Sequence, residues 1–328
     1  MIAFKVFQKI YKTVFFPFLI SFFGFFGNRI SMILFLALGR KLGLKNVQFD
    51  FPFEFPIKES ENKIIYSKIA VQDDDISVLP FLASRRNWEC EEPILAYKIL
   101  QHSMADNRYV ILDLGANYGF FTQQLMLLIK SCDYTAAPIQ KAVLFEPDNR
   151  LTPIIKMNLA FLLPEVEVEI IGKPVTETGG EVEFIVDQGN STMNSMSRDA
   201  LEITQGKLIT RRVNSISASS LCTFIPNDDK VRVLYKSDIQ GYDVQVLGAI
   251  SDSLLQKIDI LIFEYWQKDK LEWEKRLSSL NNLFKRFPFV TITNRKGKNI
   301  DLNNTDLKTI LESLDKYDFL NVLCSRFK

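Results

Sequence analysis

Four short apolar runs in the middle of the chain constrain its fold more than any other feature. They show no regular alternation of apolar and polar residues, which favours parallel strands covered on both faces. The runs are YVILD (109–113), AVLFE (142–146), VRVLYKSD (231–238) and IDILIFE (258–264). Stretches with helical periodicity lie between and after them, at 121–130, 151–162, 242–255 and 270–286. This order predicts an α/β fold with a doubly wound, mostly parallel sheet.

Each of these runs stops at a carboxylate. In open α/β sheets the ligand binds outside the carboxyl ends of the strands. A single acid at a strand end can merely cap the following helix, but four at one edge predict a polar pocket. The four acids are Asp113, Glu146, Asp238 and Glu264.

The loop after the first run carries two glycines, Gly115 and Gly119, with Asn117 between them. A dinucleotide-binding loop would read G-x-G-x-x-G, and the carboxylate of Asp113 would repel a pyrophosphate and attract a cation. A ligand can approach the backbone at Gly115, and the helix beginning near Gly119 offers a positive end to an anion. S-adenosylmethionine carries an ammonium group, a carboxylate and a ribose, so it fits this loop, with Glu146 placed to bind the ribose hydroxyls.

Three blocks of the sequence resemble those of FkbM-type methyltransferases: DLGANYGFFT (113–122), FEPD (145–148) with Asn158 after it, and KSDIQGYDVQVLGAI (236–250). The resemblance spans about residues 88–267 and includes GGEVEFIV (179–186) and GNSTMNS (189–195). It implies a class I, Rossmann-like fold, S-adenosylmethionine as the cofactor, and O-methylation of a sugar, glycan or glycolipid hydroxyl. The cofactor-binding residues that it implies are Asp113, Gly115, Ala116, Asn117, Gly119, Glu146 and Pro147.

The chain departs from the family's third block, which usually reads K-x-D-x-E-G-x-E. Gln240 and Asp243 stand where the family has glutamates. Two function classes therefore stay open: an O-methyltransferase, or a methyltransferase-like protein that binds without catalysis at a membrane surface. The intact Asp113, Glu146 and Asp238 favour the enzyme, because a fold kept only for packing would not need them.

Methyl transfer to a hydroxyl is an in-line displacement that needs a closely held acceptor oxygen and removal of its proton. Asp238 is the predicted base. Lys236, two residues earlier on the same strand face, would hold Asp238 ionised or orient the acceptor oxygen. Glu264 is the second candidate, and a Mg²⁺ ion held between Asp238 and Glu264 is an alternative. The remaining interpretation is that Lys236 and Asp238 form a purely structural ion pair.

Charge and cysteine usage argue against several other classes. The chain of 328 residues has 40 basic and 39 acidic residues, so it has no basic field to hold nucleic acid. Four scattered cysteines and the single His102 argue against a Cys/His metal site, a disulfide framework and a Ser-His-Asp mechanism. Such thiols indicate a reducing, cytoplasmic compartment. The expected partner is a small-molecule or glycan acceptor, and the sequence does not indicate an oligomeric state.

The segment 1–45 differs from the rest of the chain. It begins with a basic amphipathic pattern that carries Lys5, Lys9 and Lys12, and continues as an apolar stretch interrupted by Pro17 and Arg29. We expect a hydrophobic helical appendage that lies peripherally at the inner membrane surface. The alternatives are packing against its own domain, a membrane span, or a cleaved signal.

Residues 46–90 are predicted to form an extended, strand-rich arm or lid. Four phenylalanines alternate with other residues between 49 and 55, and Pro52 and Pro56 push this strand toward a sheet edge. The acidic turn QDDD (72–75) shows no motif to which chemistry can be assigned. The methyltransferase domain is expected over residues 91–328.

Overall fold

The computed structural model describes most of the chain beyond residue 46. The predicted appendage at 1–45 lies outside the described residues. In the part that is described, no helix is both long and apolar enough to cross a membrane. The described residues are 47–58, 61–72, 75, 78, 82, 89–103, 106–131, 139–160, 162, 165–196, 207–266, 273–294, 299–300, 306–314 and 319–327.

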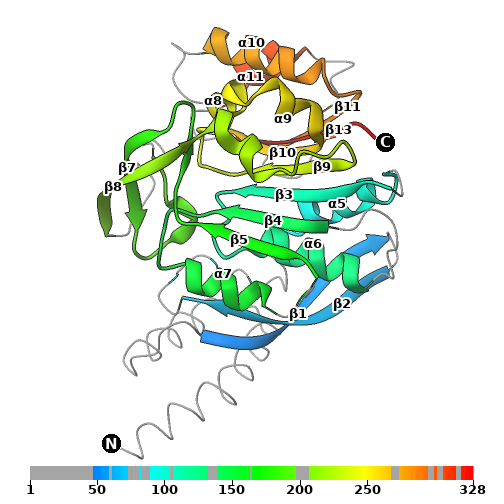
Figure 1. Cartoon of the computed structure of the whole chain (residues 1–328), viewed down its shortest axis with the longest axis vertical. Helices are drawn as coiled ribbons and strands as arrows, with labels where there is room; N and C mark the ends of the chain where they lie inside the picture. Colours follow the sequence, from blue (N-terminus) through cyan, green and yellow to red (C-terminus); the bar gives the residue numbers. More distant parts are fainter. Residues whose placement is uncertain are drawn as a thin grey trace, which may run out of the picture.

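Among these residues, an eight-stranded mixed sheet forms the centre of the molecule (Figure 1). Its five parallel strands are neighbours: β10 (Ile258–Trp266), β9 (Val231–Ser237), β3 (Arg108–Leu114), β4 (Ile139–Phe145) and β5 (Glu167–Ile171). Antiparallel strands extend the sheet beyond β10 in the order β13 (Phe319–Ser325), β11 (Phe289–Asn294) and β12 (Asn299–Ile300). The four predicted runs are the adjacent strands β4, β3, β9 and β10, which confirms the doubly wound, mostly parallel fold class.

Helices cover both faces of this sheet, and β3 shows how the sequence achieves it. Its side chains are buried from Tyr109 to Leu114, and successive residues contribute to opposite hydrophobic clusters. Tyr109 and Ile111 join the cluster of α5 (Glu91–Leu100), α6 (Phe120–Ser131) and α7 (Thr152–Leu159). Val110 and Leu112 join the cluster of η4 (Ala218–Phe224), α8 (Asp243–Ala249), α9 (Asp252–Lys257), α10 (Trp273–Phe284) and α11 (Leu307–Glu312).

One predicted helix is divided in two. The pattern over 242–255 suggested a single helix, but α8 ends at Ala249 and the backbone is extended at Ile250 and Ser251. The Ser251 side chain accepts a hydrogen bond of 3.2 Å from the N–H of Leu254, so it caps α9. This local hydrogen bond outweighs the continuity of the apolar pattern.

A smaller, three-stranded sheet projects beside the main one, with the order β6-β8-β7 among the described residues (Figure 1). It comprises β6 (Val175–Thr176), β7 (Gly180–Asp187) and β8 (Leu208–Ser217). The short helix η2 (Ser191–Met193) follows β7 and is folded back on it, because Ile185 and Ser195 exchange two backbone hydrogen bonds of 2.9 and 3.0 Å.

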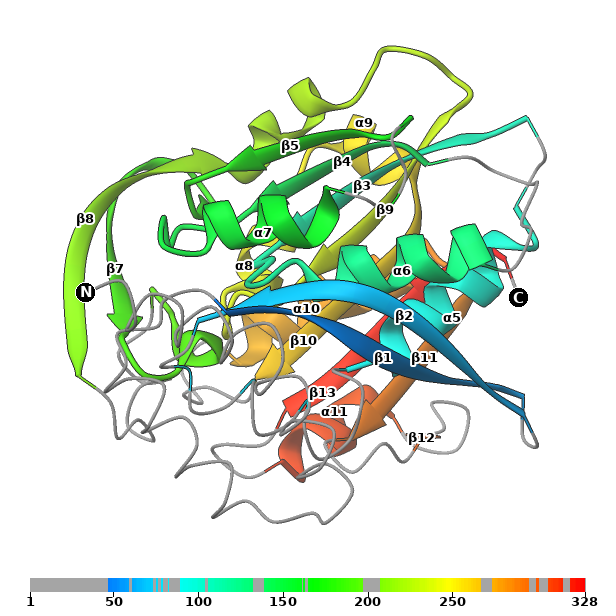
Figure 2. The same cartoon turned by 90° about the horizontal axis from the view of Figure 1, so that it is seen from below.

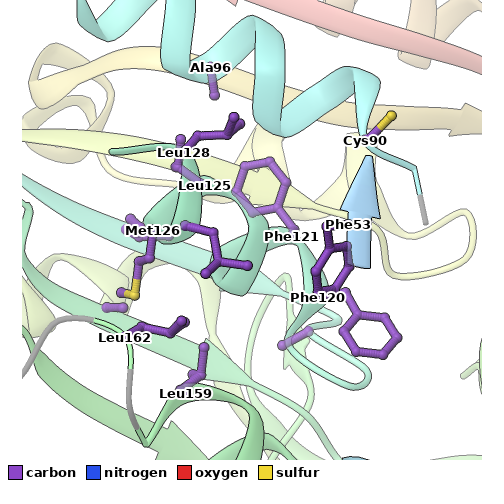
Figure 3. Close-up of a cluster of buried hydrophobic side chains, with 14 of the residues drawn as sticks. Phe53, Cys90, Ala96, Phe120, Phe121, Leu125, Met126, Leu128, Leu159 and Leu162 are labelled. Atoms are coloured by element: carbon purple, nitrogen blue, oxygen red, sulfur yellow. The ribbon is translucent and has the colours of Figure 1, made fainter. Parts of the chain in front are cut away.

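The described part of segment 46–90 includes an antiparallel hairpin, β1 (Val47–Lys58) and β2 (Glu61–Val71). Phe51, Phe53 and Phe55 are each at most 1% exposed and share the cluster that contains α6. The hairpin runs beneath α6 and α7 (Figure 2), and Phe53 meets Phe120 edge to face with ring centroids 6.4 Å apart (Figure 3). The hairpin therefore belongs to the core of the domain.

Candidate active site

The register of the sheet aligns three of the four predicted acids, Glu146, Asp238 and Glu264, at its carboxyl edge. Leu114 pairs with Phe145 on one side and with Ser237 on the other, and Ser237 pairs with Phe263. The next residue on each of these four adjacent strands therefore falls in one row across the sheet. That row consists of Glu146, Gly115, Asp238 and Glu264.

A cavity of about 280 Å³ opens at this row, near the lower end of the roughly 300–1,000 Å³ usual for small-molecule sites. Most of the predicted cofactor-binding residues and all three catalytic candidates line this cavity. Asp113 and Gly119 are not part of the lining. The predicted residues that line the cavity are Gly115, Ala116, Asn117, Glu146, Pro147, Lys236, Asp238 and Glu264.

The glycine loop folds tightly against the end of β9. Gly115, Asn117 and Gly119 have φ values of 74°, 50° and 75°, a region that favours glycine. A Cβ on Gly115 would lie 1.9 Å from the backbone oxygen of Asp238. The sequence explains this glycine by the approach of a ligand, and Gly115 does line the cavity. The structure adds a second reason, because the chain's own backbone fills the space of its Cβ.

Several N–H groups of this loop are already paired within the protein. Those of Gly115 and Ala116 donate to the carbonyl oxygen of Phe145 at 2.9 and 3.1 Å. That of Asn117 donates to Glu146 Oε2 at 2.8 Å. A phosphate needs a cluster of free N–H groups, so the loop is poorly suited to a pyrophosphate.

Glu146 both shapes the loop and faces the cavity. Its Oε2 accepts from Asn117 and its Oε1 accepts from the N–H of Asp148 at 2.8 Å, while the side chain is only 4% exposed. Burial raises the pKa of Glu146 to about 7, against the effect of these two hydrogen bonds. A carboxylate offers about four acceptor positions, so acceptor positions remain for the hydroxyls of a ligand.

Asp113 lies behind the cavity wall. It shares the face of β3 that meets α6, where its Oδ2 accepts from Thr122 Oγ1 at 2.7 Å. Its Oδ1 lies 3.8 Å from Lys236 Nζ, and burial raises the pKa of Asp113. Asp113 therefore acts on the cavity through Lys236.

The ammonium group of Lys236 sits among carboxylates at the cavity wall. Its Nζ is 3.7 Å from Asp238 Oδ2, and the residue is 6% exposed. Burial opposes the charge, but Asp238, Asp113, Glu92 and Glu89 together raise the pKa of Lys236. The lysine is therefore held in its charged form.

Asp238 follows β9 directly and is fixed from several sides. Its backbone N–H donates to the Leu114 carbonyl oxygen at 2.9 Å, and its Oδ1 accepts from Gln240 Nε2 at 2.8 Å. Gln240 has a φ of 53° and lines the cavity beside Asp238. The unusual residue at position 240 thus contacts the predicted base itself.

Glu264 completes the row on the side of β10. Its Oε2 accepts a hydrogen bond of 2.8 Å from Trp266 Nε1, and the Trp266 ring stacks on Phe319 at 5.6 Å. Burial, followed by the charge of Asp238, raises the pKa of Glu264 well above its usual value. Trp266 and Phe319 also line the cavity, so an aromatic wall stands next to this acid.

Two acids of the cavity, Glu89 and Glu92, and most of its roof are not named by the sequence patterns above. Glu92, in the first turn of α5, lines the cavity, and burial followed by the charges of Glu89 and Asp238 raises its pKa to about 8, although Lys236 opposes the shift. Acids are common in the first turn of any helix, so the sequence carried no signal. The roof is the segment 191–196, which the sequence marked only as part of the resemblance.

Metal ligands do not gather in the described part of the chain. No group of three or more His, Cys, Asp or Glu side chains there could hold a metal ion. The Mg²⁺ alternative for Asp238 and Glu264 therefore gains no support.

Comparison with known proteins gives matches in solved structures alone. No protein-family model matches the chain, and no curated protein sequence does. An O-methyltransferase from Bacillus cereus in complex with SAH is similar at 10% identity, with 73% of this chain and 82% of that chain covered and a TM-score of 0.35. A precorrin-6y C5,15-methyltransferase from Geobacter metallireducens is similar at 9% identity over 71% and 87%, with a TM-score of 0.33. At this level, similarity determines neither the reaction nor the ligand.

Proposed function

We propose that the protein is an S-adenosylmethionine-dependent O-methyltransferase acting on a hydroxyl of a sugar, glycan or glycolipid. The charge of the cavity carries this proposal. The described lining residues include one ammonium group, that of Lys236, and five carboxyl side chains: Glu89, Glu92, Glu146, Asp238 and Glu264.

This charge distinguishes between the two nucleotide-like ligands that such a sheet edge could hold. A pyrophosphate would meet several carboxylates and a loop whose Gly115, Ala116 and Asn117 N–H groups are already paired. A sulfonium with an ammonium group is attracted by the same acids, and a bound cation favours the ionised forms of Glu92, Glu146 and Glu264, whose pKa values burial raises. The cavity therefore favours S-adenosylmethionine over a dinucleotide.

The lining residues also fit the individual parts of this cofactor. Glu146 retains acceptor positions for the ribose hydroxyls, and charge-assisted hydrogen bonds of this kind contribute about 1.5–3 kcal/mol each. Ala116, Asn117 and Pro147 flank Glu146 on the same wall. When bound, S-adenosylmethionine supplies an electrophilic methyl group.

The acceptor hydroxyl must lose its proton, and Asp238 is the residue we assign to remove it. Its Oδ1 accepts from Gln240, its Oδ2 faces Lys236 at 3.7 Å, and its side chain is 21% exposed toward the cavity. A positioned base of this kind contributes about 10²–10⁴-fold to the rate.

The aromatic wall of Trp266 and Phe319 suits the apolar face of a sugar ring, which supports a glycan or glycolipid acceptor. A cytoplasmic location with peripheral contact at the inner membrane surface, through residues 1–45, would bring the enzyme to such an acceptor. The acceptor rests on the sequence resemblance and on this wall, and the location rests on the sequence alone.

Parallel calorimetric titration of the full chain with S-adenosylhomocysteine and with NAD tests the cofactor. We expect binding of S-adenosylhomocysteine and none of NAD at the same concentrations. Binding of NAD alone would refute the proposal. Transfer of a labelled methyl group from S-adenosylmethionine to a panel of cell-surface glycans then tests the reaction.

The same pair of measurements separates the enzyme from the non-catalytic binding protein. Binding of S-adenosylhomocysteine followed by methyl transfer to a glycan supports the enzyme. Binding without transfer to any member of a broad panel of hydroxyl acceptors would favour the binding protein.

A further inference from the structure

A buried carboxylate just after the β1–β2 hairpin contacts two walls of the cavity. Asp75, four residues beyond the end of β2, is 1% exposed. Its Oδ2 accepts from the Tyr118 hydroxyl at 2.9 Å, and from Ser191 twice, through the hydroxyl at 2.6 Å and the N–H at 3.3 Å. The turn that contains Asp75 carries no recognisable catalytic or binding motif in the sequence.

The two partners belong to different walls. Tyr118 is in the glycine loop between β3 and α6, and Ser191 begins η2 in the roof; both line the cavity, whereas Asp75 does not. The Ser191 hydroxyl also lies 3.0 Å from Asn117 Oδ1, within the same loop. Loop and roof are therefore joined behind the cavity by one carboxylate.

The backbone of Ala70, five residues before Asp75, is also anchored to the loop. The side-chain amide of Asn158, in α7, accepts from the N–H of Ala70 at 2.5 Å and donates to the Ala70 carbonyl at 3.1 Å. It also donates to the carbonyl oxygen of Tyr118 at 2.8 Å. Tyr118 is thus held at its backbone by Asn158 and at its hydroxyl by Asp75.

We infer that Asp75 is a positioning residue for the ligand cavity. It fixes Tyr118 and Ser191, and through them the spacing between the glycine loop and the roof. Without Asp75 the ligand itself must order these two segments, and that cost appears as weaker binding. The inference rests on the proposed function, since it concerns the same cavity.

The chain offers a matched control for this role. The hydroxyl of Tyr109 donates to Asp259 Oδ2 at 2.9 Å, the distance found for Tyr118 and Asp75. Tyr109 and Asp259 are 0% and 1% exposed, and neither lines the cavity. Tyr118→Phe and Tyr109→Phe therefore each remove one buried hydrogen bond to a carboxylate, at the site and away from it.

The experiment measures the Kd of S-adenosylhomocysteine by calorimetry, and the thermal midpoint, for the full-length wild type and three variants. We expect Tyr118→Phe and Asp75→Ala to raise the Kd by at least about fivefold, because the site is no longer pre-organised. Tyr109→Phe should lower the thermal midpoint to a similar extent as Tyr118→Phe and change the Kd by less than about twofold. Amide exchange of the ligand-free protein should accelerate at 117–119 and 191–193 in the site variants alone.

Equal affinities for wild type and a folded Tyr118→Phe variant would overturn the inference and leave the proposed function intact. The same holds if both tyrosine variants weaken binding equally, because the effect would then be general destabilisation. If the wild type does not bind S-adenosylhomocysteine, the proposed function fails and the role of Asp75 fails with it. Should Asp75→Ala not fold, the two tyrosine variants still decide the outcome.

Discussion

The side-chain amide of Gln240 donates a hydrogen bond of 2.8 Å to Asp238 Oδ1. The FkbM-type pattern usually has glutamate at this position, and two carboxylates at that distance would oppose each other's ionisation. In this chain the neighbour is a donor, and Lys236 lies 3.7 Å from the other oxygen of Asp238. Gln240 therefore gives the predicted base a hydrogen-bond donor where the family pattern has an acid.

Gln240→Ala should lower methyl transfer at neutral pH by about tenfold or more, equivalent to about 1.4 kcal/mol in the barrier. The substitution deletes the hydrogen bond of 2.8 Å that positions Asp238 Oδ1. Gln240→Glu, which introduces the residue usual in the FkbM-type pattern, should have the smaller effect. The measurement is the rate at saturating S-adenosylmethionine, with thermal unfolding as the control for folding. An undiminished rate in Gln240→Ala would contradict this role for the amide.

The buried acids predict how the stability of the ligand-free protein depends on pH. The pKa of Glu146 is raised from 4.5 to about 7, and that of Glu92 from 4.5 to about 8. Above about pH 4.5, and up to about pH 7 for Glu146 and about pH 8 for Glu92, the folded state binds more protons than the unfolded state. The free energy of unfolding therefore falls as pH rises through this range. Their contribution is fully present below about pH 4.5 and is lost as pH passes about 7 and about 8.

Urea unfolding at a series of pH values between about 5 and about 8 measures this dependence. Glu146→Gln and Glu92→Gln should each make the decline shallower, since an amide cannot titrate. Glu165→Gln, at an exposed carboxylate, is the control. An equally steep decline in all three variants would show that other groups are responsible.

Gly115→Ala should destabilise the protein by more than about 3 kcal/mol. It combines left-handed strain of about 1–2 kcal/mol with a Cβ placed 1.9 Å from the Asp238 backbone oxygen. Gly180→Ala is the matched control, because Gly180 has a φ of +95° and a Cβ there would meet nothing within 4 Å. Gly180→Ala should lower the free energy of unfolding only by the cost of the left-handed backbone strain. Chemical unfolding compares the two, and equal losses would contradict the close approach at Gly115.

The strand-end acids were predictable because they depend on two local rules: apolar runs form the strands, and parallel strands end at one edge. The alternation of side chains along β3 could also have predicted the face on which Asp113 lies. Asp113 follows Tyr109 and Ile111 at intervals of two, on the α6 face, which takes its carboxylate behind the wall.

The contacts of Asp75 with Tyr118 and Ser191 could not be predicted in this way. Asp75 and Ser191 are 116 residues apart in the chain, and no periodic pattern links an acidic turn after a hairpin to a polar loop after β7. The close approach of the Asp238 backbone to Gly115 could not be predicted either, because Asp238 follows a strand more than a hundred residues later in the chain. Such contacts follow from the order of strands in the sheet.

The segment 1–45 gives a separate prediction. The full chain should bind liposomes containing anionic lipid, and added salt should weaken the binding, because Lys5, Lys9 and Lys12 supply the attraction. A chain that begins at Lys45 should stay folded, bind S-adenosylhomocysteine and ignore the liposomes. Co-sedimentation measures the binding, with replacement of the three lysines by glutamine as the control. Unfolding of the shortened chain, together with no liposome binding by the full one, would place these residues in the core.

The most direct test of the account is methyl transfer by Asp238→Asn. The substitution keeps the shape of the side chain and removes its basic oxygen, so the rate should fall by roughly 10²–10⁴ while the Kd of S-adenosylhomocysteine changes by less than about tenfold. A joint fall in binding and rate would instead assign Asp238 to the cofactor. A purely structural Lys236–Asp238 pair predicts a lower thermal midpoint with near-normal activity. A stable Asp238→Asn variant with full turnover would contradict the assignment of the base and transfer it to Glu264.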